Sequence, residues 1–266
     1  MIAPADVIAN RRWTRRTKPF PHFVAEGLFR EGYYRDLESG FHEVLSRGLA
    51  NRWDGRRFCR SASGYDAHVL PFSKGLPDPF HVLLSRPWHD VLARVTHVDA
   101  TGDVDGGLHH HEPGTADGWL HTDLSPGWFA GAVGKEEVQL SDGRRCEYVS
   151  GRATSPGVIP VERVRGAAMI LYLANGPWAP ADGGETGLYE TPDGAGGAFV
   201  APADNSMLLF ECTPFSYHAF RRNRRKARNS LVLWIHRSRE DAVARFGEAS
   251  IVPWRPRVSR GMGARP

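Results

Sequence analysis

Apolar positions follow two different patterns along this chain, and the change comes near residue 95. From about residue 30 to residue 49 the apolar side chains recur near helical spacing, which predicts a helix. A second helix is predicted at 87–95. The segment 19–24 precedes both helices, and we expect it to be an extended strand. Residues 1–95 should therefore form a support of helices and extended chain.

After residue 95, short apolar runs are separated by Gly, Pro and Asp, which is typical of an antiparallel β sandwich or small barrel. The clearest runs are 167–173, 206–210 and 230–235. Segment 124–165 is polar and rich in glycine, so we expect loop and hairpin there. Part of it should act as a lid, although the pattern does not say which part. Residues 251–266 lack periodicity and should form a loose tail.

The composition is that of an ordinary globular protein, since 41% of the 266 residues are hydrophobic and 11% are aromatic. No apolar stretch approaches the roughly 20 residues that span a bilayer. The first residues have no apolar segment behind their charges, so we expect no signal peptide and a cytoplasmic protein. Cys59, Cys146 and Cys212 are scattered, which argues against a disulfide framework or a structural zinc site.

The net charge of +4 is too modest to demand a nucleic-acid partner. Basic side chains gather in segment 221–226, RRNRRK, where a solvated hairpin turn is the plainest interpretation. Two functional alternatives stay open for this run: docking to an acidic carrier protein, and attraction of an anionic substrate. No aromatic residue interrupts the run, which disfavours nucleic acid.

The first chemical signal is the pair His121 and Asp123, with His218 far downstream. Two imidazoles and one carboxylate form the donor set that holds a ferrous ion and leaves coordination positions open. If 119–123 is a strand, positions i and i+2 point to the same side and can share one ion. The pair alone is a weak signal, because a turn histidine beside a capping aspartate gives the same letters.

The second signal is an arginine at the start of an apolar strand. Arg228 and Ser230 share one face of the run that ends at 235. A guanidinium is costly to bury unless an anion meets it. That anion is either an Asp or Glu of this chain or the carboxylate of a bound diacid, and the residues alone leave both open.

The stretch 109–112, HHHE, also looks rich in metal ligands. It lies among Gly and Asp, where we expect a solvent-exposed loop. Neighbouring residues of a loop rarely converge on one ion, so we do not assign it to a metal site. Contact with a substrate is the alternative.

Taken in order, these motifs resemble the iron(II)- and 2-oxoglutarate-dependent oxygenase superfamily, in its prolyl 4-hydroxylase-like branch. The resemblance covers most of the chain. It rests on the segments 18–24, 119–123, 170–175 and 183–189, followed by His218, Arg228 and Ser230. It implies a double-stranded β-helix, or jelly roll, with N-terminal helices packed on one sheet. We expect one oxygenase domain over 1–266, with its core at 96–240.

The resemblance also implies roles for individual residues. His121, Asp123 and His218 would hold Fe(II), and Arg228 would bind the far carboxylate of 2-oxoglutarate. Tyr172 and Ser230 would donate hydrogen bonds to that co-substrate, although Tyr172 could equally be a core aromatic residue. No catalytic residue is implied beyond the metal ligands.

The implied activity is the O2- and 2-oxoglutarate-dependent hydroxylation of an unactivated C–H bond. Related halogenases lack the carboxylate ligand, so Asp123 disfavours halogenation, whereas desaturation or cyclisation would use the same ligands. We expect a small metabolite as substrate, such as an amino acid or an intermediate of natural product biosynthesis. The alternatives are a prolyl hydroxylase acting on a protein or peptide, and a cupin-like isomerase or binding module. The candidates for the substrate pocket are Trp119, Trp128 and Glu185.

Overall fold

The computed structural model describes residues 3–60, 66–134 and 136–254. Its large mixed sheet has the strand order β1-β2-β12-β9-β14-β6-β5-β4-β3, with β7 beside β9 and β8 beside β6. These strands are β1 (Thr14–Arg16), β2 (His22–Ala25), β3 (Leu49–Ala50), β4 (Phe58–Arg60), β5 (His68–Pro71), β6 (Ala100–His111), β7 (Pro126–Phe129), β8 (Gln139–Leu140), β9 (Val161–Tyr172), β12 (Ser206–Glu211) and β14 (Arg228–Ser238).

A smaller sheet has the order β11-β10-β13. Its strands are β10 (Thr186–Tyr189), β11 (Ala198–Val200) and β13 (Tyr217–Phe220). The helices are α1 (Pro4–Val7), α2 (Glu31–Ser46), α3 (Arg86–Thr96) and α4 (Arg239–Phe246), with short 3-10 turns η1 (Asp78–Val82), η2 (Pro180–Asp182) and η3 (Glu248–Ser250). The predicted helices at about 30–49 and 87–95 are confirmed as α2 and α3.

The central strands of the large sheet are buried on both faces. Met169 and Leu171 of β9 belong to the larger core, which also contains residues of α2 and α3. The alternate residues Ile170 and Tyr172 belong to a smaller core that includes residues of β10 and β11. This double burial explains why β9 and β14 are continuous apolar runs instead of alternating ones.

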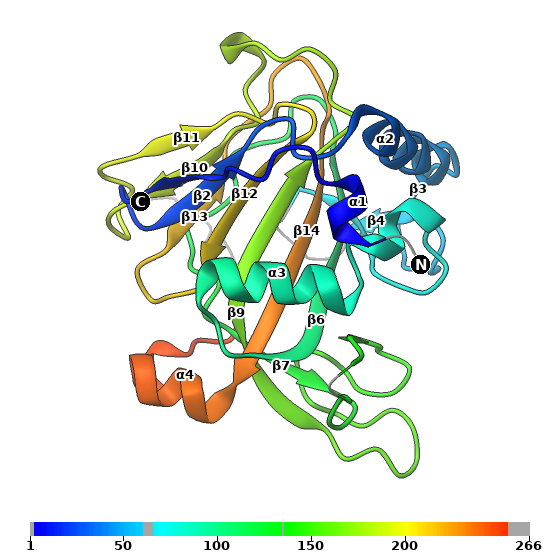
Figure 1. Cartoon of the computed structure of the whole chain (residues 1–266), viewed down its shortest axis with the longest axis vertical. Coiled ribbons are helices and arrows are strands. Elements are labelled where there is room, and N and C mark those ends of the chain that lie inside the picture. The colour runs from blue at the N-terminus through cyan, green and yellow to red at the C-terminus, as the bar shows by residue number, and fades with distance from the viewer. Residues whose placement is uncertain (1–2, 61–65, 135, 255–266) are drawn as a thin grey trace, which may run out of the picture.

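Figure 1 shows α3 lying across β9, β14 and β6, while β10, β11 and β13 form a separate layer. Helix α3 begins where the Ser85 hydroxyl accepts a hydrogen bond from the Trp88 backbone N–H at 3.4 Å, and it ends at His97 in the left-handed region. The predicted architecture is confirmed: a mainly β double-stranded β-helix, with helices packed on one sheet.

The prediction of an exposed loop at 109–112 is wrong. Strand β6 continues to His111, and His109, His110 and His111 are all buried. The glycines that suggested a loop instead allow close strand packing: a Cβ at Gly106 would lie 2.1 Å from the Val232 carbonyl oxygen on β14.

Segment 119–123 does not form the strand that we considered for it. Only His121 pairs, through an isolated antiparallel bridge to His218. Segment 124–165 contains the short strands β7 and β8 and the first residues of β9. Strand β7 pairs with β9 and β8 pairs in parallel with β6, so the two short strands do not form a hairpin with each other.

The tail is not loose over its first four residues. The Val252 backbone N–H donates to the Leu124 carbonyl at 3.2 Å, and the Trp254 backbone N–H donates to the Ser125 hydroxyl at 3.3 Å. Residues 255–266 lie outside the described residues. Cys59, Cys146 and Cys212 are free and buried. No helix in the described part of the chain has the length and apolar character needed to cross a membrane.

Candidate metal centre

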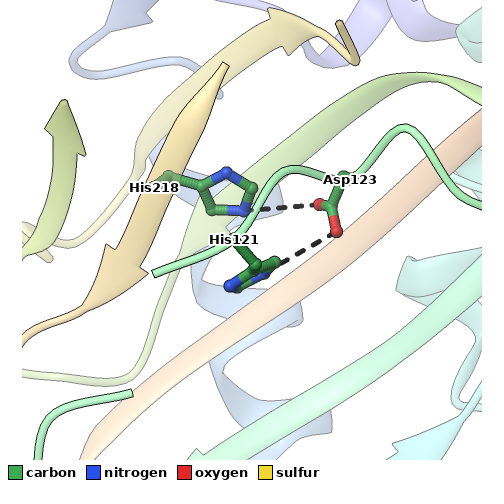
Figure 2. Close-up of side chains that lie close together, drawn as sticks. All are labelled: His121, Asp123 and His218. Carbon is green, nitrogen blue, oxygen red and sulfur yellow. Dashed lines mark ion pairs between the residues drawn. The ribbon is translucent and has the colours of Figure 1, made fainter. Parts of the chain in front are cut away.

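Three potential metal ligands meet between the two sheets. His218 lies on β13, and the bridge between His121 and His218 brings the segment with His121 and Asp123 against that strand. Asp123 Oδ1 lies 3.7 Å from His121 Nε2, and Asp123 Oδ2 lies 3.4 Å from His218 Nε2. Figure 2 shows the three side chains pointing toward one another. One ligand atom from each lies within 4.8 Å of the others.

Backbone carbonyls fix the orientation of both imidazoles. His121 Nδ1 lies 2.8 Å from the Trp119 carbonyl oxygen, and His218 Nδ1 lies 3.0 Å from the Ser216 carbonyl oxygen. A carbonyl only accepts, so each Nδ1 must carry its proton. Each Nε2 therefore points into the cluster and can offer a lone pair to a cation. This tautomer is the one that metal-binding histidines need when they bind through Nε2.

Two donors hold the Asp123 carboxylate. Arg165 Nη1 donates to Oδ1 at 3.1 Å, and the Trp234 indole N–H donates to Oδ2 at 2.7 Å. The carboxylate cannot rotate without breaking one of these bonds. Arg165 and Trp234 also touch each other, since the guanidinium carbon lies 3.7 Å from the indole ring centroid.

The electrostatics of the cluster favour a charged carboxylate. Burial alone would raise the pKa of Asp123, but His218, Arg165 and His121 outweigh it and hold that pKa well below its usual range. Burial, with His218 nearby, lowers the pKa of His121 to about 4. Burial also disfavours a charged His218, but Asp123 overcomes this effect and raises the pKa of His218. A bound cation would displace the His218 proton, as metals do at ionisable ligands.

The cluster lines a cavity of about 280 Å³ between the sheets. Much of its wall is apolar, with Ile170, Val232 and Trp254 among the lining residues. Arg228 lines the same cavity and is buried. The three candidate metal ligands and a buried guanidinium therefore line the same cavity.

Arg228 has polar neighbours but no acidic partner among the described residues. Its Nη1 donates to the Ser230 hydroxyl at 2.8 Å, and its Nη2 donates to the Thr186 hydroxyl at 3.2 Å. Its Nε is buried without a hydrogen-bond partner. Of the two anions left open by the sequence, an internal Asp or Glu is therefore excluded within the described residues. A bound carboxylate would supply the acidic partner that this guanidinium lacks.

Tyr172 and Ser230 lie close to Arg228 but not on the cavity wall. The Tyr172 hydroxyl donates to Thr186 at 2.7 Å, and the Arg228 guanidinium lies 5.1 Å from the Tyr172 ring centroid. Both Tyr172 and Ser230 are fully buried and neither is among the lining residues. Their hydrogen bonds to a co-substrate stay predictions, and in this structure Thr186, which lines the cavity, lies between Tyr172 and Arg228.

The three predicted pocket residues lie elsewhere. Glu185 lines a second cavity, of about 340 Å³, together with Arg221, Arg222 and Arg224 of the basic run. Trp128 packs against Gly151, where a Cβ would lie 2.5 Å from the indole. Trp119 is half-buried outside both main cores, with its ring centroid 6.2 Å from that of His121 and 5.3 Å from that of Trp254. It is Trp254, in the expected loose tail, that lines the main cavity.

We did not predict Arg165, Trp234 or Tyr148 as site residues, yet all three line the main cavity. His109 lines it as well, and contact with a substrate was the alternative given for the stretch 109–112. Trp234 had a signal, because it shares strand parity with Arg228. Arg165 had none, because its orientation depends on a β-bulge. Trp234 and His236 are two positions apart on β14, but their partners on β9, Ala168 and Arg165, are three positions apart. The extra residue in β9 is a bulge, and it turns Arg165 toward the cavity.

The model of the 2OG-Fe(II) oxygenase superfamily matches residues 159–236, which run from the start of β9 to near the end of β14. The match includes His218 and Arg228. This part of the chain is therefore similar to the 2OG-Fe(II) oxygenase superfamily. Members of this superfamily use Fe(II), 2-oxoglutarate and O2, and the donor set of His121, Asp123 and His218 fits that metal.

Solved structures of prolyl hydroxylases have a fold similar to that of this chain. A prolyl hydroxylase from Trichoplax adhaerens, in complex with a peptide of hypoxia inducible factor, is 12% identical with a TM-score of 0.54; the match covers 84% of this chain and 86% of that one. A prolyl 4-hydroxylase from Phytophthora capsici is 17% identical with a TM-score of 0.51, over 83% and 61% of the two chains. A Pseudomonas putida prolyl-4-hydroxylase is 16% identical with a TM-score of 0.49, over 81% and 87%. No curated protein matches the chain significantly in sequence.

Proposed function

We propose that this protein hydroxylates an unactivated C–H bond of a small molecule, coupled to conversion of 2-oxoglutarate and O2 into succinate and CO2. One observation carries the proposal. A His–Asp–His cluster and a buried arginine with no acidic partner among the described residues line the same cavity. A metal-binding jelly roll without a diacid co-substrate has no need of that arginine, which weighs against the cupin-like alternative.

The residues of the chain would divide the work as follows. The Nε2 atoms of His121 and His218 and one oxygen of Asp123 would hold the ferrous ion. Arg228 would bind the far carboxylate of 2-oxoglutarate, with its guanidinium held in place by Ser230 and Thr186. With iron, co-substrate and O2 bound, the site would supply the oxidising power to replace a C–H bond by C–OH.

The cavity favours a substrate whose reacting group is small and largely uncharged. Its volume of about 280 Å³ lies near the lower end for ligand sites, and the co-substrate must share it. His109, which lines the cavity outside the metal cluster, is neutral because burial lowers its pKa to about 3. We therefore propose a metabolite of modest size, such as an amino acid or a natural-product intermediate, as the substrate.

A prolyl residue of a peptide is the second candidate, because the same cavity would accept a single apolar ring while the rest of a peptide stays outside. The Trichoplax adhaerens prolyl hydroxylase, of similar fold, was solved with a peptide. An acidic carrier protein would dock on the basic run at the second cavity, where Asp117 and Glu185 neutralise part of the positive charge.

Turnover measurements separate these candidates. The protein would be incubated with Fe(II), 2-oxoglutarate and O2, together with either a pool of small metabolites or a set of proline-containing peptides. Succinate release and a mass gain of one oxygen atom would be followed. Stimulation by the metabolite pool supports the first candidate, and stimulation by the peptides supports the second. No succinate above that of Asp123→Ala, with either pool, contradicts the oxygenase proposal.

A further inference from the structure

Arg165 is a buried cation beside the metal cluster to which the proposed reaction gives no role. Its Nη1 donates to Asp123 at 3.1 Å, its Nη2 lies 3.6 Å from Asp105, and its Nε donates to the Tyr148 hydroxyl at 3.2 Å. All three nitrogens of the guanidinium are therefore engaged. One face of the guanidinium also packs on the Trp234 indole.

The direction of every hydrogen bond leading to Arg165 is fixed. His236 Nδ1 lies 3.0 Å from the Asp103 carbonyl oxygen, so Nδ1 carries the proton and Nε2 must accept. The Tyr148 hydroxyl lies 2.8 Å from His236 Nε2 and therefore donates to it. That leaves the Tyr148 oxygen free to accept from Arg165. Burial lowers the pKa of His236 to about 3, so this pattern holds from neutral pH into the acid range.

The loop that carries Tyr148 is packed tightly enough to act as a fixed support. A Cβ at Gly127 would lie 2.3 Å from the Tyr148 ring, and a Cβ at Gly151 would lie 2.5 Å from the Trp128 ring. The Trp128 backbone N–H also donates to the Tyr148 carbonyl at 2.8 Å. Glycines at 127 and 151 thus let this loop, part of the segment 124–165, dock directly on β7.

We propose that Arg165 is a positioning residue for the metal site. Fixed by Tyr148 and Trp234, it sets the orientation of the Asp123 carboxylate and so the affinity and coordination geometry of the bound metal. This inference rests on the proposed function, because it takes Asp123 as a metal ligand. It adds that the loop around Tyr148 acts on the metal through His236, Tyr148 and Arg165.

The physical reason is that a carboxylate offers two equivalent oxygens and can bind a metal through either or both. Arg165 and Trp234 each occupy a lone pair on a different oxygen, which limits how the group can turn toward the ion. Hydrogen-bond partners of metal ligands typically change metal affinity or activity by 10- to 100-fold when they are removed. A planar guanidinium is suited to this task because its three nitrogens reach Asp123, Asp105 and Tyr148 at once, whereas lysine would keep the charge and lose this geometry.

The test is anaerobic titration of the metal-free, full-length protein with Co(II) alone, followed by calorimetry and by the visible Co(II) absorption. Arg165→Gln should weaken binding by about 10- to 100-fold and change the Co(II) spectrum, because Asp123 can then turn. Arg165→Lys should recover part of the affinity. Tyr148→Phe, which removes one hydroxyl and leaves Arg165 in place, should weaken binding by a smaller factor.

Arg163→Gln is the matched control. Arg163 lies two residues away on β9 and donates to the buried Asp103 at 2.7 Å, and it forms no hydrogen bond or ion pair with His121, Asp123 or His218. It should bind Co(II) as the wild type does, even if it is less stable. If Arg165→Gln does not fold, Arg165→Lys and Tyr148→Phe decide the question.

The outcomes separate the two proposals. A wild type that binds no Co(II) contradicts the proposed function itself. A wild type that binds Co(II), with folded Arg165 and Tyr148 variants that match it in affinity and spectrum, overturns the role of Arg165 alone. Equal weakening in Arg163→Gln would also overturn it, because the effect would then be general loss of stability.

Discussion

Replacing Arg228 by glutamine should separate co-substrate binding from folding. In the wild type the guanidinium is buried, has no acidic partner among the described residues, and leaves Nε without a hydrogen bond. Truncating one member of a buried charge pair costs about 2–5 kcal/mol of binding. Taking about 3 kcal/mol, Arg228→Gln should raise the Kd for 2-oxoglutarate by about 100-fold.

The same change should not destabilise the protein in the absence of 2-oxoglutarate. Removing a buried charge that lacks a counter-charge is neutral or favourable to folding. Arg237 provides the opposite case and hence the control. It is fully buried and donates to Glu211 at 2.5 Å and to Asp241 at 3.0 Å. Both acids are partly exposed, so Arg237→Gln should lower the free energy of unfolding by about 3 kcal/mol, near the low end for a broken buried pair.

Thermal unfolding with and without 2-oxoglutarate, under anaerobic conditions with Co(II) present, measures both effects. At a concentration 100 times the wild-type Kd, the ligand should stabilise the wild type by about 2.7 kcal/mol and Arg228→Gln by only about 0.4 kcal/mol. At about 2–4 °C per kcal/mol, the shift in Tm should fall from about 5–10 °C to about 1 °C. Arg237→Gln should start from a lower Tm and keep the full shift. An Arg228→Gln protein that keeps the full shift, or that unfolds as early as Arg237→Gln, would refute the reasoning.

Three further predictions follow from single residues. Asp123→Ala should abolish substrate oxidation and leave the circular dichroism spectrum nearly unchanged; retained oxidation would remove Asp123 from the metal ligands. His236 is fully buried with a pKa lowered from 6.5 to about 3, so only the unfolded state takes up its proton as the pH falls below 6.5, and stability is lost. From pH 7.5 to 5.5 the wild type should lose about 1.4 kcal/mol of unfolding free energy through His236. Urea unfolding of His236→Gln should show a loss smaller by that amount, and a loss equal to that of the wild type would contradict this role of His236. Gly106→Ala would place a Cβ 2.1 Å from the Val232 carbonyl oxygen, at a φ of +143°, and should lower the free energy of unfolding by about 2 kcal/mol or more. The control Gly143→Ala, whose Cβ would have nothing within 4 Å, should leave it unchanged. Equal stabilities of the two variants would show that β6 and β14 can move apart.

The sequence predicted the parts of the fold that depend on local pattern. The helical spacing in α2 and α3 and the apolar runs of β9, β12 and β14 are visible because burial dictates the residue type at each position. The three histidines of β6 show where this reasoning fails. Polar side chains beside glycine are typical of loops, but here the glycines allow β6 to approach β14 closely and the histidines are buried between β5 and β14.

The candidate site divides in the same way. We singled out His121, Asp123, His218 and Arg228 from their residue types together with the family resemblance, and the structure places all four at one cavity. Arg165 could not be predicted, because only the bulge in β9 turns it toward the cavity. Trp254 could not either, because two hydrogen bonds formed with residues more than a hundred positions away hold the tail at the cavity. Pairings so distant in sequence leave no periodic signal.

The most direct test of the central claim is an anaerobic titration of the metal-free protein with Fe(II), followed by 2-oxoglutarate. A ferrous ion chelated by a 2-oxo acid is expected to absorb in the visible range, which neither component does alone. We expect this band to appear in the wild type at one equivalent each of Fe(II) and 2-oxoglutarate. It should be absent in Asp123→Ala, and Arg228→Gln should need far more 2-oxoglutarate to develop it. A folded wild-type protein that binds Fe(II) and develops no band with 2-oxoglutarate would contradict the central claim.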